Sequence, residues 1–170
     1  MGTSAARFIL LLLLSLVVGA TFGIWAGYNP SSLSAAAYVE QQQNAIRSLN
    51  TLLPAMGAAC ILLAGWLAFQ AKGDAHTRYF LIGAIVCLVT AALVTRFGNQ
   101  PINAEVMTWN PQSPPAHWAQ LRDTWWQWHV VRTLAGILGL VLTLLALLPR
   151  RSASPPFSSP PNSERTAARR

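Results

Sequence analysis

Four long apolar stretches alternate with shorter polar segments along the chain. Their apolar cores cover residues 8–25, 52–69, 79–94 and 130–148, and their interiors are free of charged residues. Each stretch approaches the roughly 20 residues that a helix needs to cross a bilayer. Lipid offers no hydrogen-bond partner to an open strand, so each stretch must be helical. The pattern predicts membrane helices at about 8–27, 52–70, 79–97 and 130–149.

The first stretch has an alternative interpretation as a cleaved signal peptide. Arg7 precedes it, and residues 18–20 resemble a cleavage site. The apolar run nevertheless continues past Ala20 as far as Trp25, which is longer than the usual apolar core of a signal peptide. We therefore expect the first stretch to be retained as a membrane helix.

The polar connection between the first two stretches, residues 29–51, can also form a helix. A break at Pro30 precedes apolar residues near helical spacing, which are Leu33, Ala37, Ile46, Leu49 and Leu53. Beyond the fourth stretch the composition changes to serine, proline and arginine, with almost no apolar residue to bury. We expect one membrane domain over residues 1–150 and a disordered basic tail over residues 151–170.

Composition supports a membrane protein and narrows the choice of partners. Hydrophobic residues make up 53% of the chain and charged residues 10%, against about 25% charged in a typical soluble domain. The net charge of +7 comes from basic residues at the ends of the apolar stretches and in the tail, where they attract anionic lipid headgroups. The lipid bilayer is therefore the expected partner, and nucleic acid is not.

No pattern in the chain indicates a metal or an organic cofactor. The two cysteines, Cys60 and Cys87, lie in apolar runs without a C-x-x-C motif, so a thiol oxidoreductase is not indicated. The three histidines are scattered, and no paired carboxylates accompany them. The chain also has no glycine-rich phosphate loop. We expect no cofactor and no bound metal.

The distribution of basic residues predicts the orientation in the membrane. One predicted side holds 8 of the 12, namely Arg7, Lys72, Arg78, Arg150, Arg151, Arg165, Arg169 and Arg170. The other side holds Arg47, Arg96, Arg122 and Arg132. Cytoplasmic loops carry an excess of lysine and arginine. We therefore expect a multi-pass protein of the cell membrane with both termini in the cytoplasm.

Residues 96–132 differ from the rest of the chain. They read RFGNQPINAEVMTWNPQSPPAHWAQLRDTWWQWHVVR and contain five of the seven tryptophans and two of the three histidines. Pro101 can begin a short helix, because its missing N–H is not needed there. A turn at Asn110-Pro111 is followed by Ser113-Pro114, which is typical of a helix start. The fold predicted is all-α, an integral membrane four-helix bundle with an additional helical loop segment at one face.

A helix that begins there can continue without a break into the fourth stretch. Residues three or four positions apart share one face of a helix. Polar and aromatic residues with this spacing are Trp118, Arg122, Trp125, His129 and Arg132, followed by Gly136 and Gly139. Small residues let a neighbouring helix approach closely, so we expect this face to turn into the bundle.

Together these residues resemble a known family. The pattern Asn99-x-Pro101-x-Asn103, a tryptophan at position 109 and the helical face from Trp118 to Arg132 are similar to the anthrone-oxygenase-like family of small four-span membrane proteins. The resemblance covers roughly residues 8–148, and its specific part is the pattern from 99 to 132. It implies oxidation of anthrones to anthraquinones by molecular oxygen without a metal or organic cofactor. Most bacterial members of the family have no assigned reaction.

Under this resemblance His129, Asn103 and Arg132 are the expected catalytic residues. His129 can act as a general base toward a phenolic or C–H proton, or it can be a structural histidine that ties the last helix to the loop. Arg132 can hold an enolate or a carboxylate. Alternatively, it extends to lipid headgroups or pairs with Glu105 or Asp123.

The residues expected to bind substrate are Asn99, Trp118, Arg122 and Trp125. Asn99 and Asn103 can donate hydrogen bonds to a developing oxyanion, or they can cap the short helix after the third stretch. Trp118 and Trp125 can line a pocket for a flat aromatic ligand, or they can belong to a belt of tryptophans at the membrane interface.

Two functions are therefore open. The first is a membrane-embedded, oxygenase-like enzyme that acts on a hydrophobic aromatic or quinone-type small molecule. The alternative is a non-catalytic membrane protein, either a small-molecule binder or an accessory subunit of a membrane complex. An enclosed, aromatic-lined cavity that reaches His129 favours the first, whereas purely structural hydrogen bonds favour the second.

Overall fold

The structure, a computed structural model, describes residues 2–148, so the tail predicted over residues 151–170 lies outside the described residues. The elements follow in the order α1 (Thr3–Gly27), η1 (Pro30–Ser32), α2 (Ala35–Leu49), α3 (Leu52–Gln70), α4 (Ala75–Val94), η2 (Thr95–Asn99), α5 (Gln100–Val106) and α6 (Trp118–Leu147). Residues 2–148 contain no strand, which confirms the all-α prediction.

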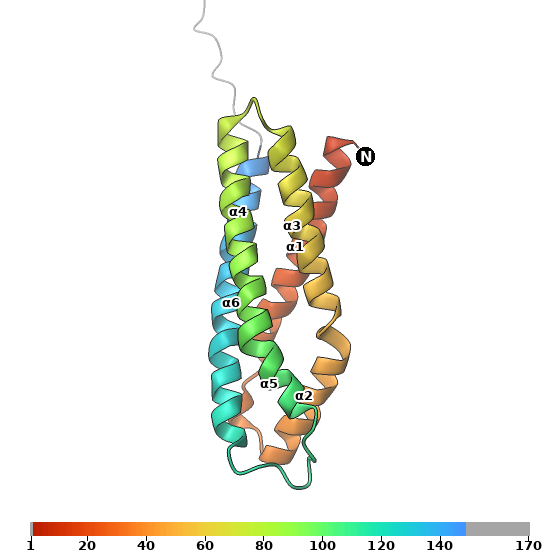
Figure 1. The fold of residues 1–170 in the computed structure, drawn as a ribbon, viewed down its shortest axis with the longest axis vertical. Coiled ribbons are helices and arrows are strands. Elements are labelled where there is room, and N and C mark those ends of the chain that lie inside the picture. The colour runs from red at the N-terminus through yellow and green to blue at the C-terminus, as the bar shows by residue number, and fades with distance from the viewer. Residues whose placement is uncertain (1, 149–170) are drawn as a thin grey trace, which may run out of the picture.

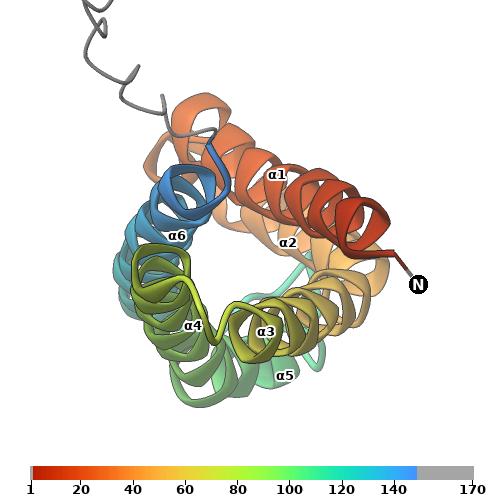
Figure 2. The same cartoon turned by 90° about the horizontal axis from the view of Figure 1, so that it is seen from above.

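The four predicted membrane spans are all present. The helical segments long and apolar enough to cross a bilayer are Thr3–Ser32, Leu52–Gln70, Ala75–Val106 and Trp118–Leu147. Figure 2 views the bundle end on and shows α1, α3, α4 and α6 arranged in a ring. Both α1 and α4 contact α3 and α6, so each helix packs against its two neighbours in the ring. The chain is a multi-pass helical membrane protein.

Each span buries a narrow stripe of residues and exposes an apolar surface. The buried residues of α1 are spaced by three or four positions and are Ala6, Leu10, Leu14, Val18 and Thr21. On α6 the stripe includes Gly139, where an added Cβ would lie 3.1 Å from the side chain of Leu88. Leu62 is 74% exposed. Such outward-facing apolar side chains are typical of a protein surrounded by lipid.

Short helices form a second layer at one end of the bundle. Figure 1 shows α2 and α5 at the end opposite to the N-terminus and the turn between α3 and α4. Ser34 caps α2, because its Oγ accepts a hydrogen bond from the N–H of Ala37 at 3.3 Å. Gln43 ties α2 to the end of α5, since its Nε2 donates to the carbonyl oxygens of Val106 and Trp109 at 2.9 Å each.

The third span continues into α5 through one wider turn. The segment η2 is π-helical and joins α4 to α5 without a break. The short helix predicted at Pro101 forms as α5, with this proline in its first turn. A π-helical turn inside a longer helix is often found at a functional site.

The last helix begins later than the sequence indicates. It starts at Trp118 rather than near Pro114, because Pro115 disfavours the helical conformation of the residue before it. The predicted turn at Asn110-Pro111 is present, and Oδ1 of Asn110 accepts a hydrogen bond from the N–H of Gln112 at 3.0 Å. A second turn at residues 116–117 leads into α6. From Trp118 to Leu147 the helix is unbroken, so the predicted face does lie on one helix that enters the membrane.

Candidate functional site

Trp125 is held by a chain of two amide side chains. Its indole Nε1 donates to Oδ1 of Asn103 at 2.8 Å, and Nδ2 of Asn103 donates to Oδ1 of Asn50 at 2.9 Å. The three residues come from α6, from α5 and from the link between α2 and α3. Three segments distant in the sequence therefore fix the orientation of one indole ring.

Asn99 supports the same tryptophan through its backbone. Its Nδ2 donates to the carbonyl oxygen of Trp125 at 3.0 Å. The residue is fully buried, and its Oδ1 has no hydrogen-bond partner among the described residues. The capping alternative is not observed, because no side chain caps the N-terminus of α5. The side chains of Asn99 and Asn103 both point instead to α6.

His129 is enclosed by aromatic rings and by α1. The rings of Trp125 and Trp126 stack on it, with centroid distances of 5.1 and 5.6 Å. Its Nε2 lies 3.1 Å from the carbonyl oxygen of Thr21, and its Nδ1 lies 2.9 Å from Nη2 of Arg132. A carbonyl oxygen only accepts and a guanidinium only donates. These partners therefore fix a neutral imidazole that carries its hydrogen on Nε2.

Two cavities meet beside this cluster. The first, of about 180 Å³, lies at the loop end, and its lining includes Tyr28, Asn103, Trp125 and Arg132. The second, of about 190 Å³, lies on the bundle axis, because residues of α1, α3, α4 and α6 all line it. Residues that line both cavities are Leu53, Pro54, Thr95 and Arg132. Arg132 therefore lies where the axial cavity meets the loop-end cavity, whose lining contains more polar residues.

Part of the predicted site is brought together around the loop-end cavity. Asn103, Trp125 and Arg132 line it directly. His129 is fully buried and lines neither cavity, and it contacts the lining through Trp125 and Arg132. Asn99 lies behind Trp125. The structure thus places Asn103, Trp125 and Arg132 at the cavity surface and His129 and Asn99 directly behind them.

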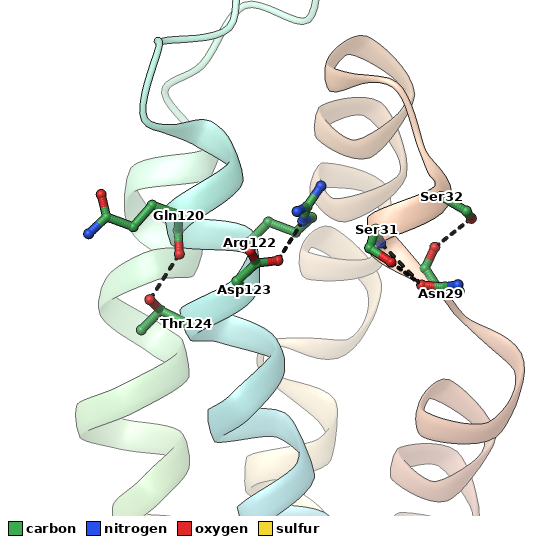
Figure 3. A network of polar contacts seen from close by, with 7 residues as sticks. All are labelled: Asn29, Ser31, Ser32, Gln120, Arg122, Asp123 and Thr124. Atoms are coloured by element: carbon green, nitrogen blue, oxygen red, sulfur yellow. Dashed lines mark hydrogen bonds and ion pairs between the residues drawn. The ribbon is translucent and has the colours of Figure 1, made fainter.

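Two predicted binding residues lie apart from both cavities. The guanidinium of Arg122 is 4.9 Å from the ring centroid of Trp118, and it pairs with Asp123 at 2.9 Å (Figure 3). Trp118 packs on Tyr38 with 5.8 Å between ring centroids. These contacts extend the face of α6 toward the loop. A role of Trp118 and Arg122 in substrate binding stays a prediction.

The first loop and α2 supply cavity residues that the sequence analysis did not assign. Tyr28, Gln41, Gln42 and Asn50 line the loop-end cavity. Gln42 is only 2% exposed, and the buried hydroxyl of Tyr28 has no hydrogen-bond partner among the described residues. The phenol of Tyr38 is buried nearby in α2, and this burial raises its pKa above the ordinary value, so the group stays neutral. In the sequence, Tyr28, Tyr38 and the glutamines at positions 41–43 can border a pocket, but their spacing does not require it.

The described residues contain no group of three or more His, Cys, Asp or Glu side chains that could hold a metal ion. Comparison with known proteins gives one match. The family model described as anthrone oxygenase matches residues 42–142, which include Asn103, Trp125, His129 and Arg132. No curated protein and no solved structure matches the chain. Because the family match extends over more than half of the sequence, the chain belongs to the anthrone oxygenase family.

Proposed function

We propose that this protein binds a flat, hydrophobic aromatic molecule across the two cavities and oxidises one of its ring methylene groups to a carbonyl with molecular oxygen. The observation that carries the proposal is the loop-end cavity, whose lining includes Trp125, Arg132 and Tyr28. Sites for small ligands are mostly apolar and contain a few placed polar groups. Membership of the anthrone oxygenase family supports the same type of substrate.

The proposed reaction consumes one molecule of oxygen. The ring methylene loses a proton, and the electron pair of that C–H bond is delocalised onto the ring carbonyl as an enolate. One-electron transfer to oxygen and recombination then form a C–O bond and a peroxide. Cleavage of the O–O bond with loss of water leaves the new carbonyl. One oxygen atom stays in the product and the other leaves as water, so the methylene carbon is oxidised and oxygen is reduced.

The side chains divide this work in a way that follows from their contacts. Arg132 holds the enolate oxygen. Asn103 donates to the same oxygen from Nδ2, since only one of the two hydrogens on this nitrogen is bound to Asn50. When Arg132 turns to the ligand, Nδ1 of His129 loses its partner and is free to receive the methylene proton. Trp125 supplies a flat surface for the rings of the substrate.

One observation favours the alternative of a non-catalytic binder or accessory subunit. Both ring nitrogens of His129 already have protein partners, as in a histidine that only links two helices. In that case the cavities hold a ligand, and no group in them takes up a proton from it.

Conversion of anthrone to anthraquinone by the purified protein tests the proposal. Anthrone also oxidises in air, so the rate is compared with detergent alone and with heat-denatured protein. We expect a protein-dependent rate that Arg132→Gln lowers by about 10² to 10³, as for the loss of an oxyanion donor, and labelled oxygen gas should leave one labelled atom in each product. Binding of anthraquinone without any acceleration would instead establish the non-catalytic function.

A further inference from the structure

The two cavities carry positive charge that no acidic side chain balances. Arg132 lines both cavities and Arg96 lines the axial one, whereas no aspartate or glutamate lines either. The carboxylates of Glu105 and Asp123 lie at the loop end, where Glu105 contacts His117 and Asp123 pairs with Arg122. The neutral ring of His129 is the hydrogen-bond partner of Arg132. Any ligand in the cavities therefore meets an excess of positive charge.

Neither guanidinium is saturated by the protein. Arg132 uses its Nε and Nη2 toward His129, and a guanidinium has further N–H groups that need acceptors. Arg96 contacts the ring of Phe97 at 6.0 Å and has no carboxylate partner among the described residues. Arg96 is exposed, whereas Arg132 is partly buried within a membrane span, where a cation without a counter-charge is costly. An anion that enters the cavities removes this cost.

The shape of the cavities indicates how such an anion is built. The axial cavity is mostly apolar, with side chains such as Leu14, Val18, Ile61 and Leu88 in its lining. Arg132 stands at the junction, next to Trp125 on the loop side. We propose that the ligand is an aromatic organic anion whose carboxylate or ionised phenol lies beside Arg132, while its rings extend into the apolar space. This inference rests on the proposed function and specifies the charge of the molecule that the cavities bind.

A matched pair of ligands tests the proposal on the purified full-length protein. Anthraquinone-2-carboxylate and the neutral anthraquinone-2-carboxamide have the same rings and nearly the same shape. Binding of each is measured through quenching of tryptophan fluorescence in the same detergent. We expect the carboxylate to bind the wild-type protein at least about tenfold more tightly, the factor that corresponds to about 1.4 kcal/mol.

Three variants assign this preference to the cavity. Arg132→Gln should reduce the ratio of the two dissociation constants to less than about threefold, and Arg132→Lys should keep most of it, because the charge remains. Arg96 lines the axial cavity, and its side chain is exposed, so Arg96→Gln should fold normally. This variant gives a second test if Arg132→Gln does not fold. The control is Arg78→Gln, which removes an exposed cation that lines neither cavity and should leave the ratio unchanged.

The outcomes separate this inference from the function on which it rests. Equal binding of both ligands to the wild-type protein, or a ratio unchanged in both the Arg132→Gln and Arg96→Gln variants, overturns the inference and leaves a cavity that binds aromatic rings. Failure of both ligands to bind overturns the proposed function itself. Oleate is also tested as a competitor of the bound anthraquinone-2-carboxylate. If oleate displaces it at lower concentrations than an aromatic carboxylate does, the natural anion is derived from lipid, which contradicts an aromatic ligand.

Discussion

Arg132 donates hydrogen bonds from two of its nitrogens, Nε at 3.2 Å and Nη2 at 2.9 Å, to a single acceptor, Nδ1 of His129. The opposite ring nitrogen, Nε2, faces the carbonyl oxygen of Thr21 on α1. The imidazole therefore links α6 to α1. Its one basic nitrogen, Nδ1, is covered by Arg132, which we expect to bind the substrate oxyanion. His129 can act as a base only after Arg132 moves away from Nδ1. Binding of the ligand by Arg132 would therefore expose the basic nitrogen of His129.

Substitution of His129 distinguishes a base from a structural link. In His129→Gln the amide N–H can still donate to Thr21, but no basic nitrogen remains. We expect the melting temperature in detergent to change little and turnover of anthrone to fall by about 10² to 10⁴, the usual cost of removing a general base. His129→Ala should lose both stability and activity, because it also leaves Arg132 without its buried acceptor.

The control for these variants is His76→Ala. The ring of this histidine contacts that of Phe80 near the start of α4, at the opposite end of the bundle from the loop-end cavity. The melting temperature and the turnover of His76→Ala should both match the wild type. Full turnover by a folded His129→Gln protein contradicts a catalytic His129 and leaves it as a link between α1 and α6.

The spans and the face of α6 could be predicted because their signals are local. A bilayer imposes a minimum length and an apolar composition on each helix, and residues 52–70 meet both conditions in the sequence as α3 does in the structure. Spacing by three and four likewise placed Trp125, His129 and Arg132 on one helical face. The start of α6 was predicted wrongly, because Pro115 disfavours the helical conformation at Pro114 and the helix begins only at Trp118.

The cavities could not be predicted, because they depend on contacts between distant segments. Thr21 and His129 are 108 positions apart in the sequence, and Asn50 and Asn103 are 53 apart. No periodicity in the chain indicates that α2 folds over the end of the bundle and places Gln42 in the lining. The cavities beside Arg132 arise from the way the helices pack against one another, and that packing cannot be deduced from the candidate residues alone.

Gly98 provides a stability test of the contact between η2 and α6. A Cβ added at this glycine would lie 2.7 Å from Cγ of Trp128, an atom close to the backbone that cannot move aside cheaply. We expect Gly98→Ala to lower stability by about 1 to 3 kcal/mol, the usual cost of overpacking, although alanine favours helices over glycine. Gly65→Ala is the matched control, because a Cβ there meets nothing within 4 Å. A Gly98→Ala protein that melts at or above the wild-type temperature contradicts this packing.

The orientation in the membrane is a prediction that cysteine labelling can test. The structure places the N-terminus and the turn between α3 and α4 at one end of the bundle (Figure 1), and we expect that end to face the cytoplasm. In a variant without Cys60 and Cys87, an impermeant thiol reagent added to intact cells should label Asn44→Cys and Gln112→Cys. It should label Ser4→Cys and Gly73→Cys only after the cells are opened. The reverse pattern means that the count of basic residues does not set the orientation.

If the loop-end and axial cavities hold the substrate, a bulky side chain introduced into one of them should weaken binding. Gly57 lines the axial cavity, and a Cβ there meets nothing within 4 Å, so Gly57→Leu introduces a side chain that adds bulk at the cavity wall. Gly65 is on the same helix, is equally unobstructed and lines neither cavity, so Gly65→Leu is the matched control.

The measurement is the dissociation constant of anthraquinone-2-carboxylate for each variant, with the melting temperature recorded alongside. We expect Gly57→Leu to weaken binding by at least about tenfold, a loss of about 1.4 kcal/mol, without a fall in melting temperature. Gly65→Leu should bind as the wild type does. Wild-type affinity in a folded Gly57→Leu protein would show that the ligand binds elsewhere and would contradict the account.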